Sequence, residues 1–352
     1  MAFEFQTNVT LHPRYIQEQF TKFLPNFIQP DIGSFWGLDS SQNMVKSNAD
    51  LPLGLEEIKA FSKDYIGEVA EFNGNATDIP TVDVVLGELK GVETAIHINA
   101  ATWTKFELNK QQLAQKNRTY MPTLDIVGEK MLAMGEFHDR NEHDRVLFGL
   151  SNKENFKGIY NQTDVRTLDV TDDVYALTPS QLYDLFIDWI YEFKTDNQDF
   201  TNLSRIEMNI PTPLMKRLSR PYNDNYDSTS VFSRLTDSRQ GYYVGAINDH
   251  FENEGAYLNT KINKGVTAYP TNRDRIIIKL RGNQNPKTNS ILGNNNLRTE
   301  TLERHYFPRL VETPFTPDGG LTWKVFSFGA STGVYTYRPQ RIMYVDINNA
   351  SK

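Results

Sequence analysis

Cysteine is absent from this chain, and the absence excludes three kinds of chemistry. Without a thiol the protein has no disulfide bridge, no thiolate metal ligand and no cysteine nucleophile. Stability must therefore come from buried surface or from assembly. The absence also agrees with a reducing compartment, in which disulfides do not persist.

Long apolar runs and a basic excess are also missing. No run of about eighteen apolar residues occurs, and the N-terminus has no basic stretch followed by a continuous apolar one. We therefore expect a cytoplasmic protein that neither is exported nor spans a membrane. The 37 Lys and Arg residues face 44 Asp and Glu residues, which gives a net charge of −7. This balance argues against a surface that binds nucleic acid throughout, although it leaves room for a local basic face.

Catalytic motifs are missing as well: the sequence has no GxSxG, HExxH, Walker loop or GxGxxG. Asp318-Gly319-Gly320 is followed by the strand-like LTWKVFSFG and not by a helix, so it predicts a hairpin turn and not a phosphate loop. What is present suits a folded protein. With 39% hydrophobic and 12% aromatic residues, the 352-residue chain can build a core, and its length suggests two or three domains.

The best candidate for chemistry is a group of histidines and carboxylates in one helical window: Glu136, His138, Asp139, Glu142 and His143. Such side chains bind metals or transfer protons. The two histidines are five residues apart, about 140° around a helix, so they cannot share a metal within it. A spacing of four suits intrahelical ion pairs on a solvated or inter-subunit face. A metal-dependent hydrolase using His138, Glu142 or His143 remains the alternative.

Basic residues form three small groups with acidic residues between them. We interpret the groups as solvated faces or inter-subunit salt-bridge sites, and expect any DNA contact to be weak and without sequence preference. The groups are Lys216-Arg217 with Arg220, Arg273 with Arg275, and Arg298 with Arg304 and Arg309.

The order of predicted elements is more informative than any motif. Alternating apolar residues around an Asn73-Gly74-Asn75 turn predict a long hairpin from about residue 65. A helical pattern follows over 103–117, and the longest one runs to Phe148, with Gly149 ending it. The N-terminal 64 residues mix aromatic side chains with proline and glycine, which favours either an ordinary subdomain or an arm that packs on another subunit.

Helix and strand alternate from about residue 175 to 240, as in a compact α/β module. Thr178-Pro179-Ser180-Gln181 is a capping box that begins a helix. Thr212-Pro213 predicts a second helix start, and Ser228 or Thr229 a third. Beyond residue 240 we expect the buried run Ile276–Ile278, an Asn-rich surface loop over 282–296 and closing strands.

This order of parts resembles that of the major capsid proteins of tailed bacteriophages, the Hong Kong ninety-seven type fold that encapsulin shells share. The segments that carry the resemblance are DIPTVDV, TWTKFELNKQQLAQKN, HDRNEHDRVLFGLSNKENFKGIYNQTDV, TPSQLYDLFIDWI and GVYTYRPQRIMYVDI. The resemblance implies an α+β fold. It divides the chain into an N-terminal arm (1–64), an E-loop hairpin (65–102), a peripheral domain (103–174) with a spine helix (121–148), an axial α/β domain (175–308) and return strands (309–352).

The same resemblance implies a non-enzymatic protein without cofactor, metal or catalytic residues, which self-assembles as hexamers and pentamers into an icosahedral shell around double-stranded DNA. It implies a separate scaffolding protein, a portal and, in some shells, a decoration protein as partners. The location would be the virion, after assembly in the host cytoplasm and without membrane contact. An encapsulin-like compartment that stores an enzyme cargo is the alternative within the same fold.

Overall fold

The computed structural model describes residues 45–59, 61–66, 83–88, 91–116, 125–197, 205–223, 227–237, 244–262, 269–281, 301–312, 314, 320–336 and 339–352. The described residues form two compact units. The smaller unit draws on Ile98–His138 and Leu310–Ser327, and the larger on Phe35–His97, Asp139–Arg309 and Phe328–Lys352. No helix in the described part of the chain is both long and apolar enough to cross a membrane.

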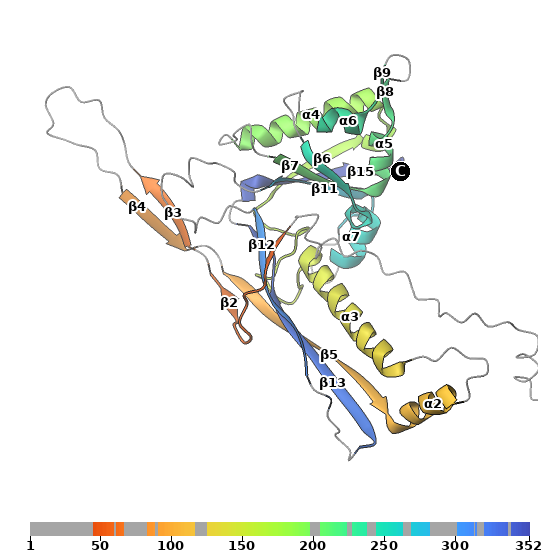
Figure 1. Ribbon diagram of the computed structural model, residues 1–352. Coiled ribbons are helices and arrows are strands. Elements are labelled where there is room, and N and C mark those ends of the chain that lie inside the picture. Colours follow the sequence, from red (N-terminus) through yellow and green to blue (C-terminus); the bar gives the residue numbers. More distant parts are fainter. Residues whose placement is uncertain are drawn as a thin grey trace, which may run out of the picture. The chain divides into compact units, whose positions relative to one another are not determined.

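A five-stranded mixed sheet organises the larger unit (Figure 1). Its outer pairs are parallel and its two inner pairings, β7 with β11 and β11 with β15, are antiparallel. The strand order is β10 (Val244–Asp249), β7 (Arg205–Ile210), β11 (Arg273–Arg281), β15 (Ile342–Asn348) and β6 (Arg166–Asp173).

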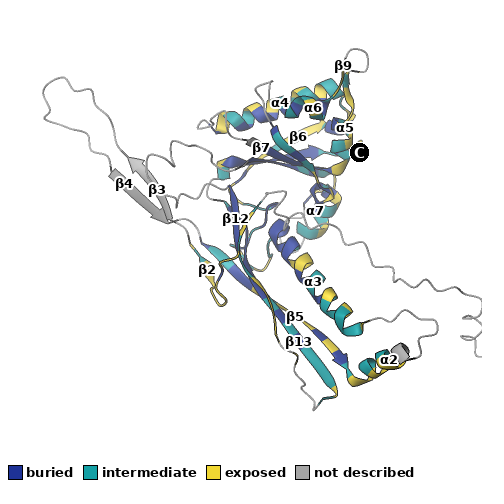
Figure 2. Ribbon diagram, viewed as in Figure 1, coloured by how far each residue is buried: buried dark blue, intermediate teal, exposed yellow. Residues whose placement is uncertain are grey.

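Both faces of this sheet are covered, so its central strands are buried on both sides. Ile276 and Ile278 face the helices α4 (Pro179–Asp196), α5 (Thr212–Leu218) and α6 (Val231–Thr236). Ile277 points the other way, into a second core that includes Leu258 of α7 (Gly255–Ile262). The predicted buried run is thereby confirmed, and Figure 2 shows the buried residues concentrated in these strands.

The capping box that the sequence predicts at the start of α4 is confirmed. The Thr178 hydroxyl accepts from the Gln181 backbone N–H at 3.4 Å, and the Thr178 N–H donates to Gln181 Oε1 at 3.0 Å. The predicted cap of the third helix is wrong. Ser228 and Thr229 lie in strand β9 (Asp227–Ser230), and Ser230 caps α6 by accepting from the Ser233 N–H at 3.1 Å.

The long helix α3 (Ile126–Phe148) ends where the sequence predicts, at Gly149. Gly149 has a φ of +67°, and its N–H donates to the Arg145 carbonyl at 2.9 Å. A Cβ at this position would lie 2.2 Å from the Phe156 carbonyl oxygen. Backbone crowding and left-handed geometry therefore both require glycine here.

We expect Gly149→Ala to lower the free energy of unfolding by more than about 1–2 kcal/mol, the cost of the left-handed conformation alone, because the clash with Phe156 adds to it. Urea unfolding measures the loss. Gly54→Ala is the matched control, since Gly54 also has a positive φ, of 93°, but its Cβ would meet nothing within 4 Å. An equal effect of the two substitutions would contradict the role of the clash.

A second sheet has six strands, in the order β1-β12-β13-β5-β2 with β14 paired to β12. β1 is parallel to β12, and β2 is antiparallel to β5. The strands are β1 (Lys46–Asn48), β12 (Leu302–Val311), β13 (Thr322–Thr332), β5 (Val92–Thr104), β2 (Glu57–Ile58) and β14 (Tyr335–Thr336).

Two further strand pairs stand apart from these sheets: β3 (Phe61–Ile66) with β4 (Asp83–Glu88), and β8 (Pro221–Asn223) with β9. The remaining helices are α2 (Lys105–Lys116), η1 (Val174–Ala176), η3 (Phe251–Asn253) and η4 (Pro339–Arg341).

The smaller unit has its own apolar core, in which Trp103 of β5 and Val325 of β13 pack with Met134 of α3. Partly buried residues, among them Leu108 of α2 and Val127 of α3, extend it. Lys130 supports this core from α3, because its ammonium donates to the Thr102 carbonyl at 2.8 Å and to Glu107 Oε1 at 3.0 Å. The helical spacing of Val127, Met131 and Met134 thus marks the buried side of α3, as the sequence predicts.

Several expectations fall outside the described residues: the N-terminal arm before residue 45, the Asn73-Gly74-Asn75 turn and the Asn-rich loop over 282–296. The five-part division of the chain stays a prediction. Within it, α3 occupies Ile126–Phe148 of the expected spine helix, and the paired strands of the expected hairpin begin at Phe61.

Candidate assembly interface and buried ionic cluster

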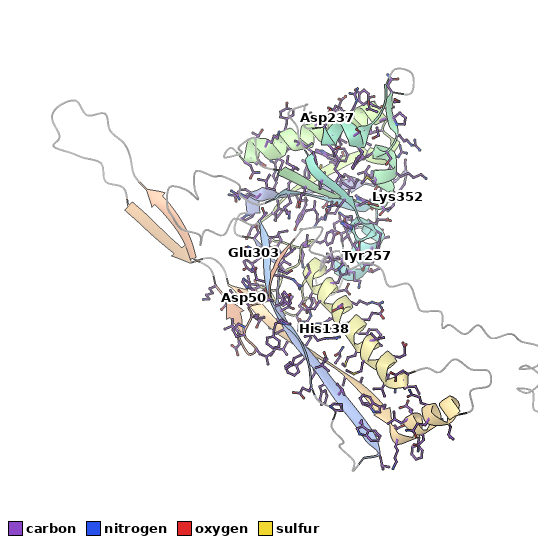
Figure 3. The ribbon with its side chains drawn as sticks, in the orientation of Figure 1. Asp50, His138, Asp237, Tyr257, Glu303 and Lys352 are labelled. Atoms are coloured by element: carbon purple, nitrogen blue, oxygen red, sulfur yellow. The ribbon has the colours of Figure 1, made fainter. Side chains whose placement is uncertain are left out.

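The candidate residues on α3 are mostly buried, which corrects the expectation of a solvated or inter-subunit face. His138, Glu142 and His143 are 8%, 6% and 5% exposed, and only Asp139 of the group is exposed. Figure 3 labels His138 on α3. The recorded partners of Glu142 and His143 include residues on other elements, so these side chains hold the chain together and do not form an isolated helical surface.

Glu142 lies at the centre of a buried ionic cluster in the larger unit. Its Oε2 accepts from Arg304 Nη1 of β12 at 3.0 Å, and its Oε1 accepts from Ser331 Oγ of β13 at 3.0 Å. His97 Nδ1 of β5 is 3.3 Å from Oε1, and Arg145 Nη1 is 3.7 Å away. One carboxylate therefore ties the long helix to three strands of the six-stranded sheet.

Burial disfavours the charged form of the two guanidiniums in this cluster. Desolvation lowers the pKa of Arg304 and of Arg145, and the charge of Glu142 opposes the change at both. Arg145 Nη1 also donates to the Ala95 carbonyl at 3.3 Å, whereas its Nε has no hydrogen-bond partner. The charged forms of both arginines therefore depend on the negative charge of the Glu142 carboxylate.

Sequence reasoning missed this cluster because its members are far apart along the chain. Arg304 is 162 positions from Glu142, and the sequence predicts that it lies on a solvated face or at an inter-subunit salt-bridge site, yet it is 4% exposed. Arg275 was likewise expected on a surface. It forms a two-point ion pair with Asp346, Nε to Oδ1 at 2.7 Å and Nη2 to Oδ2 at 2.8 Å.

His143 faces a second buried carboxylate, with 3.5 Å between its Nε2 and Glu252 Oε1. Glu252 is 3% exposed, and its Oε2 has no hydrogen-bond partner. His250 lies near both, and burial lowers its pKa to about 4, with His143 adding to the shift and Glu252 and Asp249 opposing it. Within the described ranges no group of three or more His, Asp or Glu side chains is arranged to hold a metal ion.

The lowered pKa of His250 predicts a loss of stability in mild acid. As the pH falls from 6.5 towards 4, the unfolded chain binds a proton that folded His250 does not, so the free energy of unfolding decreases, by up to about 3 kcal/mol. We expect His250→Gln to flatten the pH dependence of urea unfolding between pH 7 and 4.5. Parallel curves for the variant and the wild type would contradict this assignment.

Large apolar side chains remain exposed on the smaller unit. Ile98 is 65% exposed on β5, Phe106 and Leu113 are 71% and 60% exposed on α2, and Leu132 and Phe137 are 66% and 63% exposed on α3. Phe106 and Leu113 are seven residues apart, two helical turns, so they share one side of α2. Several large exposed apolar residues within one small unit are typical of a surface that binds another protein.

The β3–β4 pair has the form of a hairpin without support from either large sheet. Its strands are antiparallel and in register from Phe61 opposite Glu88 to Ile66 opposite Asp83. They form a two-stranded sheet of their own. An isolated two-stranded hairpin is marginally stable in water, so a contact with another surface would stabilise it.

Comparison with known proteins identifies the fold. No family model and no curated protein matches the sequence. Solved structures match nearly the whole chain: the capsid of Myoviridae Phage XM1 has a TM-score of 0.66 at 12% identity, covering 94% of this chain and 97% of that one. The capsid of the Cyanophage P-SCSP1u has a TM-score of 0.53 at 9% identity, covering 95% of both chains. The capsid of an empty GTA particle has a TM-score of 0.53 at 8% identity, covering 97% and 99%.

The chain therefore has the α+β fold of the chains in these solved phage capsids, and the fold expected from the order of sequence elements is confirmed. The match extends across both compact units and leaves only a few percent of either chain unmatched. The similarity concerns architecture, since identities of 8–12% leave few side chains in common.

Proposed function

We propose that this chain is the shell subunit of a tailed double-stranded DNA bacteriophage, which assembles as hexamers and pentamers into an icosahedral head. The observation that carries the proposal is the match to a phage capsid protein over 94% of the chain, with a TM-score of 0.66. The exposed apolar residues of the smaller unit and the β3–β4 hairpin, which pairs with neither large sheet, are the surfaces that assembly would cover. Repetition around a closed shell makes modest contacts collectively strong.

The subunit would work without catalysis, by burying surface between copies. The ionic cluster around Glu142 supports this role, because its carboxylate is engaged by arginine and serine side chains and offers no open position to a substrate. The net charge of −7 favours a container that holds DNA weakly and without sequence preference. A scaffolding protein, a portal and a decoration protein are the expected partners, and the virion, after assembly in the host cytoplasm, is the expected location.

The predicted five-part division of the chain assigns a role to each of the main structural elements. The β3–β4 pair would be the base of the E-loop, α3 the spine helix, and the five-stranded sheet with α4, α5 and α6 most of the axial domain. The axial domain, assigned to 175–308, would then also include β15 (Ile342–Asn348) and β6 (Arg166–Asp173). Both strands lie outside that range but belong to the five-stranded sheet.

Light scattering of the purified chain, alone and with a scaffolding protein, tests the proposal. We expect particles of many subunits, and a chain that stays monomeric in both conditions would contradict it. The material that co-purifies from infected cells separates the two roles of the fold: DNA and a portal indicate a phage head, whereas a packaged enzyme indicates an encapsulin-like compartment.

A further inference from the structure

An acidic groove with apolar walls opens on the larger unit, beside the start of β5. Its volume is about 610 Å³, and its lining includes Leu55, Glu56 and Glu57 on one side and Glu93 and Ile96 of β5 on the other. Leu55 is 40% exposed and Ile96 is 57% exposed. The groove thus presents apolar side chains to solvent among carboxylates.

Hydrogen bonds hold the walls of this groove in place. The Thr94 N–H donates to the Glu56 carbonyl at 2.9 Å, and the Thr94 hydroxyl donates to the Leu55 carbonyl. The carboxylate of Glu57 lies against Gly91, where a Cβ would come within 1.7 Å of Glu57 Oε1. The groove is therefore formed before any partner binds, which lowers the entropic cost of binding.

The charge of the groove is only partly balanced by the chain around it. Lys153 Nζ is 3.8 Å from Glu93 Oε2 and also donates to the Thr94 carbonyl. Neither Glu56 nor Glu57 takes part in an ion pair among residues whose placement is described. The groove therefore suits an occupant that combines basic and apolar side chains.

One long segment of this chain has that composition. Three stretches of more than ten residues lie outside the described ranges: 1–44, 67–82 and 282–300. The first has two basic and four acidic residues, and the second has three acidic and no basic residues. Residues 282–300 carry Lys287 and Arg298 against the single acid Glu300, together with the apolar pair Ile291-Leu292.

The ends of this segment are fixed close together. Thr301 Oγ1, directly after the segment, donates to the carbonyl of Leu280, just before it, at 2.6 Å. The segment of 19 residues therefore begins and ends at neighbouring points. A segment of this length can reach at most about 30 Å from those points.

We propose that residues 282–300 of one copy dock in the acidic groove of a second copy, with Lys287 and Arg298 pairing with Glu56 and Glu57. The inference rests on the proposed shell function. A groove and its complement at different places on one chain make a heterologous contact, the kind that forms a ring of identical subunits when its rotation closes.

Exchanging the charges tests the contact. One variant carries Lys287→Glu and Arg298→Glu, and the other carries Glu56→Lys and Glu57→Lys. We expect each alone to yield at least tenfold fewer shells than the wild type, counted by electron microscopy. Mixing the two variants should recover part of the yield, because each loop meets a groove of opposite charge wherever the two variants alternate around a ring. Asp184→Lys with Asp188→Lys, on the exposed side of α4, is the matched charge control and should leave the yield within twofold.

The other outcomes overturn the inference. If each variant assembles like the wild type, the contact does not exist. If the variants fail alone and in the mixture, but a single chain carrying all four substitutions assembles, the loop docks within its own copy. If the control fails as severely as the groove variant, the effect is one of net charge. A wild-type chain that forms no shells contradicts the proposed function itself, so the two failures are distinguishable.

Discussion

Replacing Glu142 with alanine is expected to lower the free energy of unfolding by about 3–5 kcal/mol, among the largest effects of any single substitution in this chain. The substitution leaves Arg304 and Arg145 buried without the carboxylate that offsets their desolvation, and it removes the acceptor of the Ser331 hydroxyl. Burial already lowers the pKa of both arginines, so neither tolerates the loss of the opposing charge.

Two further substitutions separate charge from position on the helix. Glu142→Gln keeps an oxygen acceptor but removes the charge, and we expect an intermediate loss. Asp139→Ala, on the exposed side of α3, should stay within about 0.5 kcal/mol of the wild type. Urea unfolding of the unassembled chain measures all three. A loss below about 1 kcal/mol for Glu142→Ala would show that the cluster contributes little to folding.

Shortening the β3–β4 hairpin is expected to abolish shell assembly while sparing the fold. Residues 67–82 would be replaced by Asn-Gly, a two-residue turn that can connect the facing pair Ile66 and Asp83 directly. The described strands pair with each other and not with either large sheet. We therefore expect the free energy of unfolding of the unassembled chain to change by less than about 1 kcal/mol.

The yield of shells should fall at least tenfold, because we expect the hairpin to stabilise the assembly through contacts with a neighbouring subunit. Electron microscopy counts the shells, and circular dichroism verifies the fold. A control variant that retains residues 67–82 and changes only Asn73-Gly74 to Asp-Gly, another favourable turn pair, should assemble normally. Normal assembly of the shortened variant would contradict the role of the hairpin.

Local chemistry explains which features the sequence could predict. The capping box at Thr178 and Gln181 and the left-handed glycine at 149 act within a few residues, so their residue types are sufficient to identify them. The apolar run Ile276–Ile278 predicts a strand buried on both faces for the same reason. The order of such local features led to the capsid resemblance, and the fold agrees with it.

Long-range contacts explain what could not be predicted. The Glu142 cluster joins His97, Arg145, Arg304 and Ser331, and its two hydrogen-bonded partners from β12 and β13 are 162 and 189 positions away. Helical spacing relates only neighbours three and four residues along the chain, and it therefore favours a solvated or inter-subunit face for Glu142. Buried ionic side chains look the same in sequence as exposed ones until the strands that cover them are known.

The most direct test of the central claim is electron microscopy of the chain expressed with a scaffolding protein of the expected kind and purified without any further component. We expect closed, uniform shells with icosahedral symmetry, in which the β3–β4 hairpin of each subunit lies against a neighbour. Single molecules of about 40.5 kDa under the same conditions, with both compact units folded and no shells, would contradict it.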